Sequence, residues 1–426
     1  MILIYRILIN LFFPLIIFII FFRTILKKED KNRYKEKLFS SSFDVKRDNR
    51  KKLIWFHAAS IGELKSIVPI IEKINKKNKF QFLITTVTIS SAKLFQKNLF
   101  RQKNIIHRFF PIDKISLVRN FLDHWSPNLV IFVDSEVWPN FVLEIKKRDK
   151  PLILLNSRIT KKTFNRWNLL AKFSKKIFQS FDLCISSSKE SKKYLEKFKV
   201  KNIKYFGNLK LASKIQLKSS KKESYFKKNK IWCAVSTHDG EELLCLKSHL
   251  ELKKKYKNIV TILIPRHIQR TKSINSLCKS LSLKSQILEI GQSVNTNAEI
   301  LIINSYGSTT KYLNLCKSVF IGKSLLEKLE KVGGQNPIEA AKLGCKIYHG
   351  PYVYNFQEIY DLLKNHKIAE KIKNKDELVN KLSNDFNKSK KKDIKKIDLM
   401  NNLGKNILNK TYVELLKHFN YESNKT

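Results

Sequence analysis

Short apolar runs alternate with helix-length amphipathic stretches along most of the chain, and this alternation restricts the fold more than any other feature. Strands that are apolar on both faces and separated by helices indicate a parallel sheet with crossover helices. The pattern therefore predicts an α/β protein made of two doubly wound halves. The runs that we expect to be buried strands are Leu53–Phe56, Phe82–Ile84, Ile105–Phe110, Leu129–Val133 and Leu152–Leu155 in the first half, and Ile231–Val235, Val260–Ile264, Ile300–Ile303, Val319–Ile321 and Lys346–Tyr348 in the second.

The first segment of the chain differs from the rest because it is almost entirely apolar from Ile7 to Phe22. Counted from Met1, it reaches the roughly 20 residues that a membrane-spanning helix needs. No small-residue cleavage site follows it, and the basic residues that do follow predict that the remainder lies in the cytoplasm. We expect an uncleaved single-pass membrane anchor. A helix on the membrane surface and a helix buried in the protein are the alternatives.

A polar passage rich in lysine and serine separates the two halves, and a chain of 426 residues is long enough for two domains with separate cores. In open α/β sheets, ligands bind beyond the carboxyl ends of the strands, so the loops there are the place to search for a site, with a cleft between the halves. We expect a membrane anchor at 1–23, an N-terminal Rossmann-like domain at 35–212, a linker at 213–230, a second Rossmann-like domain at 231–373 and a C-terminal helical tail at 374–426.

The net charge is strongly positive, with 84 Lys plus Arg against 36 Asp plus Glu. Such a balance is typical of proteins that bind nucleic acid or an anionic membrane. The lysines are spread over the whole sequence, however, and no nucleic-acid-binding motif accompanies them. We therefore expect no nucleic acid partner. The six cysteines form no CxxC pair and no HExxH motif is present, which predicts reduced cysteines and no metal.

Polar loops follow the expected strands of the first half. The strand ending at Phe56 leads into a small-residue loop and then Glu63, which a cleft would expose to a substrate. Ser60-x-x-Glu63 is also a capping box, which stabilises a helix and needs no ligand. Glu136 follows the strand ending at Val133, and Lys210 closes the half.

The second half carries a glycine pair, Gly333 and Gly334, that runs directly into a helix start with Asn336 and Pro337 at the cap positions. Glycines allow a ligand to approach the main chain, and the N–H groups of a helix start attract anions. This pattern favours a phosphate site. A capping box made by Asn336 and Glu339, with no ligand, is the alternative.

Taken in order, HAASIGE, SEVWP, NSR, GNLK, STHDGEE, PRH and GGQNPIE resemble the motifs of the 3-deoxy-D-manno-octulosonic acid (Kdo) transferases of lipopolysaccharide synthesis. The resemblance extends from the N-terminal segment to about Leu363. It implies a GT-B glycosyltransferase on the inner membrane, with its catalytic domains on the cytoplasmic face. The enzyme would transfer Kdo from CMP-Kdo to the lipid A precursor lipid IVA with inversion, without a metal or other cofactor, and its partners would be these substrates and the membrane lipids.

The resemblance also implies roles for individual residues. Glu63 matches the general base of the family, while Glu136 and Lys210 match positions that stabilise the transition state. Two positions depart from the family, which usually has His where Gln335 stands and an acidic residue where Ser308 stands. The residues that correspond to the CMP-binding segments are Pro265, Arg266, Gly307, Ser308, Thr309, Gly333, Gly334, Asn336, Pro337, Ile338 and Glu339.

Two other functions remain as alternatives at this point. One is a GT-B enzyme that uses another nucleotide sugar. The other is a non-catalytic, basic, membrane-tethered scaffold. A scaffold has no use for a carboxylate such as Glu63 together with a phosphate site, so these features separate the alternatives.

Overall fold

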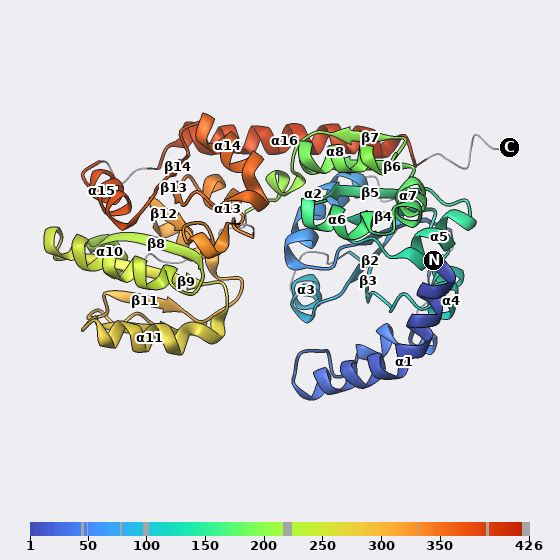
Figure 1. The fold of residues 1–426 in the computed structure, drawn as a ribbon, viewed down its shortest axis with the longest axis horizontal. Helices are drawn as coiled ribbons and strands as arrows, with labels where there is room; N and C mark the ends of the chain where they lie inside the picture. Colours follow the sequence, from blue (N-terminus) through green and yellow to red (C-terminus); the bar gives the residue numbers. More distant parts are fainter. Residues whose placement is uncertain are drawn as a thin grey trace. The chain divides into compact units, whose positions relative to one another are not determined.

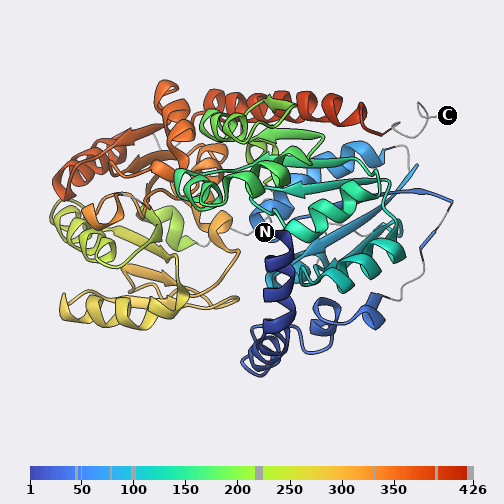
Figure 2. The ribbon, with the colours of Figure 1, turned by 45° about the vertical axis from the view of Figure 1, so that its right-hand side comes forward.

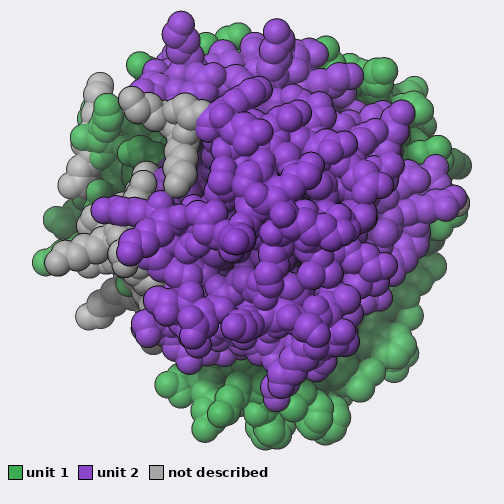
Figure 3. Space-filling view, turned by 90° about the vertical axis from the view of Figure 1, so that its left-hand side faces the viewer, with its two compact units in different colours: residues 1–214, 403–426 green, residues 215–402 purple. Residues whose placement is uncertain are grey.

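The computed structural model describes residues 1–43, 47–48, 50–76, 79–96, 102–215, 224–330, 332–388 and 392–419. The chain divides into two compact units, coloured separately in Figure 3. Unit 1 comprises Met1–Lys214 and Leu403–Thr426, and unit 2 comprises Ile215–Asn402. Of the expected linker at 213–230, residues 216–223 lie outside the described residues.

Unit 1 contains a 7-stranded sheet in the order β3-β2-β1-β4-β5-β6-β7, with every neighbouring pair parallel. The parallel α/β architecture predicted from the sequence is therefore confirmed. The strands are β1 (Lys52–His57), β2 (Phe80–Thr86), β3 (Ile105–Phe109), β4 (Leu129–Val133), β5 (Leu152–Ser157), β6 (Leu183–Ser186) and β7 (Ile203–Tyr205).

Helices connect these strands and cover the sheet (Figures 1 and 2). An aromatic core lies on one face, where Trp55 of β1 contacts Phe121 and Phe141 at ring-centroid distances of 4.9 and 5.5 Å. The helices are α2 (Ile61–Asn75), α3 (Ile89–Leu94), α4 (Ile115–Trp125), α5 (Pro139–Lys147), α6 (Lys161–Asn168), α7 (Ala171–Gln179) and α8 (Lys189–Lys197), with the 3-10 helices η1 (Tyr34–Lys37), η2 (Ser40–Phe43) and η4 (Leu209–Ala212).

Unit 2 repeats this plan with a second 7-stranded parallel sheet, in the order β10-β11-β9-β8-β12-β13-β14. Its strands are β8 (Lys230–Thr237), β9 (Ile259–Pro265), β10 (Ser285–Leu288), β11 (Ile300–Ile303), β12 (Ser318–Ile321), β13 (Lys346–His349) and β14 (Ala369–Lys371). Its helices are α9 (Ser224–Lys228), α10 (Glu241–Lys255), α11 (Thr271–Ser280), α12 (Thr309–Leu315), α13 (Ile338–Lys342), α14 (Gln357–Asn365) and α15 (Lys375–Phe386), with η5 (Ile268–Arg270), η6 (Glu327–Leu329) and η7 (Tyr354–Phe356).

The core of unit 2 includes side chains from α15. Leu378 and Leu382 of α15 are buried with Trp232 of β8 and Leu252 of α10. The segment expected as a helical tail at 374–426 is thus shared between the units, because α15 belongs to unit 2 and α16 (Ile394–Leu416) begins in unit 2 and ends in unit 1.

The N-terminal helix α1 (Ile2–Ile25) is long and apolar enough to cross a membrane, and none of its most apolar stretch is buried in the protein. The alternative of a buried helix is therefore wrong. The helix bends along its length (Figure 1) and contains Pro14, which cannot donate a helical hydrogen bond. Its first turns are hydrogen-bonded to other parts of unit 1. The Tyr5 hydroxyl donates to Asp113 across 2.7 Å, and Arg6 donates to Asn140 across 2.9 Å.

Candidate active site

Glu63 lies in the first turn of α2, directly beyond the carboxyl end of β1. The Ser60 hydroxyl accepts a hydrogen bond from the Glu63 N–H at 3.4 Å and donates to Glu63 Oε1 at 2.7 Å. The Ala59 N–H donates to Glu63 Oε2 at 2.7 Å. The capping box seen in the sequence is therefore formed, and it fixes the position of the carboxylate.

The same carboxyl group has an unusual acidity. Burial, followed by the negative charge of Asp134, raises the pKa of Glu63 from its ordinary value to about 7, with a smaller contribution from Glu136. The Ser60 hydroxyl and the Lys210 ammonium act in the opposite direction. A carboxylate with a pKa near neutrality is well suited to accept and return a proton. Glu63 thus combines a capping role with the properties of a general base.

Lys210 is held in an ion pair with Asp134. Lys210 Nζ lies 2.8 Å from Asp134 Oδ2, and both side chains are largely buried. Asp134 directly follows β4 and has a φ of +63°, a conformation that Asp and Asn adopt more readily than most residues. Lys210 and Glu136 were predicted site residues, whereas Asp134 was not, although it is an acidic residue immediately after a buried strand.

Glu136 is held by two ring N–H groups. Trp138 Nε1 donates to Glu136 Oε2 at 3.0 Å, and His57 Nε2 lies 3.3 Å from the same oxygen. The His57 ring is fully buried and stacks on Phe110 with ring centroids 3.7 Å apart. Sequence reasoning assigned no role to His57, because its partner is far away in the chain.

His57 connects β2 to Glu136 through both of its ring nitrogens. Trp55 Nε1 donates to the Thr85 hydroxyl at 2.9 Å, and His57 Nδ1 lies 3.0 Å from that hydroxyl and 3.3 Å from the Thr85 carbonyl oxygen. Since a carboxylate only accepts hydrogen bonds, the contact with Glu136 is made by Nε2–H. These contacts identify His57 as a residue that orients this carboxylate.

The loop that carries Lys210 is also fixed by polar side chains. Asn156 Oδ1 accepts from the Leu209 N–H at 2.8 Å, and Asn208 Oδ1 accepts from the Lys210 N–H at 3.0 Å. Gly207 precedes them with a φ of +105°, and a Cβ there would lie 2.8 Å from the Ile407 side chain of α16. The structure therefore brings Glu63, Glu136 and Lys210 together at the carboxyl edge of the sheet in unit 1.

In unit 2, a buried carboxylate connects the loops at the carboxyl edge. Glu241 is fully buried and accepts hydrogen bonds from the N–H groups of His238, Lys323, Ser324 and Leu325 at 2.6–3.2 Å. A Cβ at Gly322 would lie 2.6 Å from the Thr237 backbone, so only glycine fits there. Glu241 was not among the predicted site residues, and its four hydrogen bonds show a structural role.

The glycine pair lies where the backbone is tightly packed. A Cβ at Gly333 would lie 2.2 Å from the Tyr352 carbonyl oxygen, and Gly334 has a φ of +94°. Asn336 Oδ1 accepts from the Ile338 N–H at 3.1 Å. The helix α13 begins at Ile338 and Pro337 is its N-cap. The expectation that Asn336 is the N-cap and Pro337 the first helical residue is therefore wrong by one position.

The remaining predicted residues lie at the ends of β9, α12 and α13. Arg266 follows β9; its N–H donates to the Thr237 carbonyl at 3.1 Å and its side chain is exposed. Gly307, with a φ of +81°, precedes Ser308, the N-cap of α12, and Thr309 begins that helix. The hydroxyl of the next residue, Thr310, donates to Glu339 Oε1.

No group of three or more His, Cys, Asp or Glu side chains with the arrangement of a metal site occurs in the part of the chain that the structure describes. The six cysteines are all buried and free. The predicted residues at the two sheet edges include carboxylates, an ammonium, a guanidinium and backbone N–H groups.

Comparison with known proteins identifies a matching family model and several similar proteins. Residues 32–213 match the family model described as 3-deoxy-D-manno-octulosonic-acid transferase (kdotransferase). The chain is 32% identical to the 3-deoxy-D-manno-octulosonic acid transferase of Rickettsia felis, over 81% of this chain and 74% of that protein. It is 31% identical to the enzyme of the same name from Rickettsia bellii, over 87% of this chain and 88% of that protein.

Solved structures support the fold alone. A UDP-GlcNAc 2-epimerase from Neisseria meningitidis superposes with a TM-score of 0.56 over 86% of this chain and 100% of that protein, at 13% sequence identity. This similarity agrees with the GT-B architecture of two Rossmann-like units.

Proposed function

Because the chain belongs to the 3-deoxy-D-manno-octulosonic acid transferase family, and is thus a Kdo-transferring glycosyltransferase, we propose that its donor is CMP-Kdo and its acceptor is lipid IVA. The transfer proceeds with inversion at the anomeric carbon. The observation that carries the proposal is the Glu63 carboxylate, which is fixed by Ala59 and Ser60 and has a pKa of about 7.

Glu63 acts as the general base. It accepts the proton of the acceptor hydroxyl as that oxygen attacks the anomeric carbon of Kdo. A positioned base contributes typically about 10²- to 10⁴-fold to the rate, and it works best when its pKa lies near the working pH. The hydrogen bonds from Ala59 and Ser60 keep the carboxylate in one orientation, which lowers the cost of reaching the transition state.

Glu136 and Lys210 stabilise the charges that develop in the transition state. The anomeric carbon becomes oxocarbenium-like as the bond to CMP breaks, and the carboxylate of Glu136, held by His57 and Trp138, stabilises that positive charge. The ammonium of Lys210 stabilises negative charge on the leaving phosphate. Asp134 holds Lys210 in place until substrate arrives.

Unit 2 binds the CMP portion of the donor. The exposed guanidinium of Arg266 pairs with the phosphate, and backbone N–H donors come from Gly307–Thr309 and from Gly333, Gln335 and Asn336. Glu339 is bonded to Thr310 through Oε1, and its Oε2 accepts from the ribose hydroxyls. These groups provide positive potential at the phosphate, and the proposed mechanism uses no metal or other cofactor.

The helix α1 attaches the protein to the inner membrane, with both units on the cytoplasmic face. Its apolar side chains are exposed, and Arg23, Lys27 and Lys28 follow its apolar stretch. Such a placement brings the site of unit 1 to the acylated, phosphorylated acceptor. Basic residues near an anionic leaflet contribute about 1 kcal/mol each to membrane binding.

Product analysis tests the proposal. Purified protein is incubated with lipid IVA and a system that generates CMP-Kdo, and the lipid is analysed by mass spectrometry. The expected product is lipid IVA that carries Kdo. If no Kdo were transferred from CMP-Kdo but a sugar were transferred from a UDP-sugar, the proposed donor would be contradicted. If Kdo were transferred only to a different lipid, the proposed acceptor would be contradicted.

A further inference from the structure

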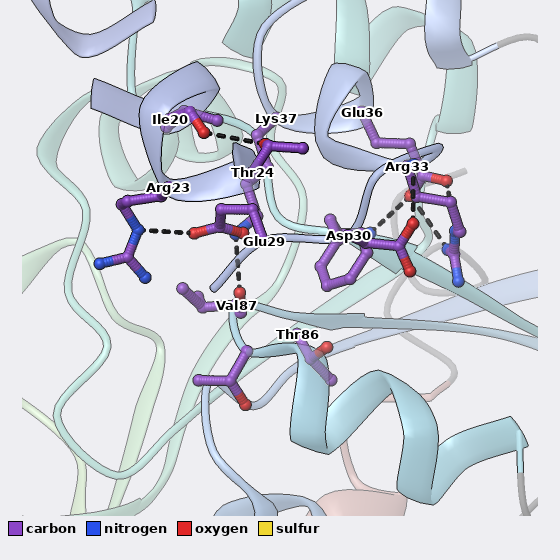
Figure 4. Close-up of polar contacts among 12 residues, drawn as sticks. Ile20, Arg23, Thr24, Glu29, Asp30, Arg33, Glu36, Lys37, Thr86 and Val87 are labelled. Atoms are coloured by element: carbon purple, nitrogen blue, oxygen red, sulfur yellow. Dashed lines mark hydrogen bonds and ion pairs between the residues drawn. The ribbon is translucent and has the colours of Figure 1, made fainter. Parts of the chain in front are cut away.

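The segment that follows α1 folds back on itself and buries an ion pair that the proposed mechanism does not use. Lys37 Nζ lies 2.6 Å from Glu29 Oε2, and Arg23 Nε lies 3.1 Å from Glu29 Oε1 (Figure 4). Lys37 and Glu29 are only 4% and 8% exposed. Since Arg23 belongs to the last turn of α1, Glu29 connects the end of that helix to Lys37.

Lys37 also contacts the loop that follows β2. Its Nζ donates a second hydrogen bond to the Val87 carbonyl at 2.8 Å (Figure 4), while the Val87 N–H donates to the Ala59 carbonyl at 3.3 Å. The Ala59 N–H in turn donates to Glu63 Oε2 at 2.7 Å. A continuous series of contacts thus leads from the end of α1 to the carboxylate of Glu63.

Other contacts also hold this segment on the sheet. Glu36 makes a separate set of contacts there, to Arg33 at 2.7 Å and to the Phe109 N–H at 2.8 Å. The Lys37 carbonyl accepts from the Ile112 N–H at 2.9 Å, a contact that does not depend on the side chain. An apolar side chain would also fill the buried space without the desolvation cost of an ammonium.

We propose that Lys37 is a positioning residue that couples the position of the C-terminal end of α1 to the geometry of the Glu63 carboxylate. Paired with Glu29, its ammonium fixes the Val87 carbonyl, and the loop at Val87 fixes Ala59. The Ala59 N–H then holds Glu63 Oε2. This inference rests on the proposed role of Glu63 as the base.

The test uses the full-length protein in vesicles that contain lipid IVA, with CMP-Kdo generated in the assay. Lys37→Met removes both hydrogen bonds and keeps the volume, Lys37→Arg keeps the charge and the donors, and Lys35→Met is a control at an exposed lysine of the same segment. Lys37→Met should lower kcat roughly tenfold to a hundredfold with little change in either KM, because the base is displaced while substrates still bind. Lys37→Arg should restore most of the activity.

The pH profile separates this role from general loss of structure. The Ala59 N–H stabilises the charged form of Glu63, so its displacement should move the acid limb of kcat/KM to higher pH. The charged groups that face Glu63, namely Asp134, Glu136 and Lys210, are unchanged in the variant. Hydrogen exchange at the Ala59 amide should be faster in Lys37→Met and unchanged in Lys35→Met, a measurement that needs no activity. If Lys37→Met does not fold, Glu29→Gln should reproduce its kinetic effects in weaker form.

The coupling would be overturned if Lys37→Met had the same kcat, pH profile and Ala59 exchange as the wild-type protein. If the wild-type protein were active and Glu63→Gln inactive in the same experiment, the proposed function would still hold. An active Glu63→Gln variant would overturn both the role of the base and the coupling. Wild-type protein that transfers no Kdo would contradict the proposed function, and unaltered exchange at Ala59 would still decide against the coupling.

Discussion

The Lys210 ammonium and the Asp134 carboxylate form an ion pair of 2.8 Å that lies beside Glu63. Its two members act on Glu63 in opposite directions, since Asp134 raises the pKa of that carboxyl group and Lys210 lowers it. Burial is the main cause of the raised pKa of the proposed base, and the pair modifies that pKa as well as placing a cation in the site. Each of these effects can be measured separately.

Replacement of the base is the most direct test. Glu63→Gln should lower kcat by about 10²- to 10⁴-fold, because glutamine cannot accept the proton of the acceptor. Glutamine still completes a capping box, so the fold and the binding of CMP should be nearly unchanged. Glu72→Gln, on the same helix and paired with Lys214, is the matched control. The measurement is steady-state kinetics. If Glu63→Gln retained most of the activity, Glu63 would serve only as a helix cap and not as the base.

Asp134→Asn should shift the pH dependence of the reaction. Asparagine tolerates the positive φ of this position and removes the negative charge that raises the pKa of Glu63. The pKa of Glu63 then falls from about 7 towards its ordinary value, and the acid limb of kcat/KM moves to lower pH. A profile of kcat/KM against pH checks this. A limb that stays in place or moves to higher pH would show that Asp134 does not act on the base.

His57→Gln should disturb Glu136 without removing a group that reaches substrate. Glutamine cannot reproduce the ring geometry that connects Thr85 to Glu136, so Glu136 keeps only the hydrogen bond from Trp138. We expect kcat to fall by about tenfold, with the KM for CMP-Kdo changed much less. Trp138→Phe should give a similar effect because it removes the other donor. A rise in KM alone would indicate a binding role for His57.

The sequence allowed prediction of most strands that are buried on both faces. It missed β6 (Leu183–Ser186), which is buried throughout but short, and the short strands at three sheet edges. β7 (Ile203–Tyr205) and β14 (Ala369–Lys371) close one edge of each sheet, and β10 (Ser285–Leu288) closes another. Three or four residues with one exposed side provide no continuous apolar run. Their positions are set by backbone pairing with a neighbouring strand, which a local pattern does not show.

A candidate site residue could be predicted from the sequence where a single loop contained a recognisable motif. Glu63 stands in a recognisable loop, whereas the roles of Asp134 and His57 depend on Lys210 and Glu136, which are distant in the chain. Local patterns contain no information on such pairs. Pro337 shows a smaller error, because helix ends vary by one or two residues between a sequence pattern and the observed hydrogen bonds.

Nucleotide selectivity should appear in thermal stability. A ligand that binds only the folded protein raises its melting temperature, and we expect CMP to do so more than UDP at equal concentration. Arg266→Met should reduce the shift with CMP, because the exposed guanidinium is proposed to pair with the phosphate. Lys272→Met, an exposed change in α11, is the control. A larger shift with UDP would contradict the proposed donor.

Membrane attachment through α1 should depend on its exposed apolar side chains. Phe18 is 64% exposed and stacks on Phe22 within the same helix, so Phe18→Lys should leave both units folded. A lysine in the centre of a membrane-inserted helix costs about 3 kcal/mol, which should move a measurable share of the protein from the membrane to the soluble fraction. Leu169→Lys, at an 83% exposed position between α6 and α7, is the matched control and should leave the distribution unchanged. Equal sedimentation of both variants with the membranes would show that α1 is not the attachment, and an effect of Leu169→Lys alone would assign it to the α6–α7 connection.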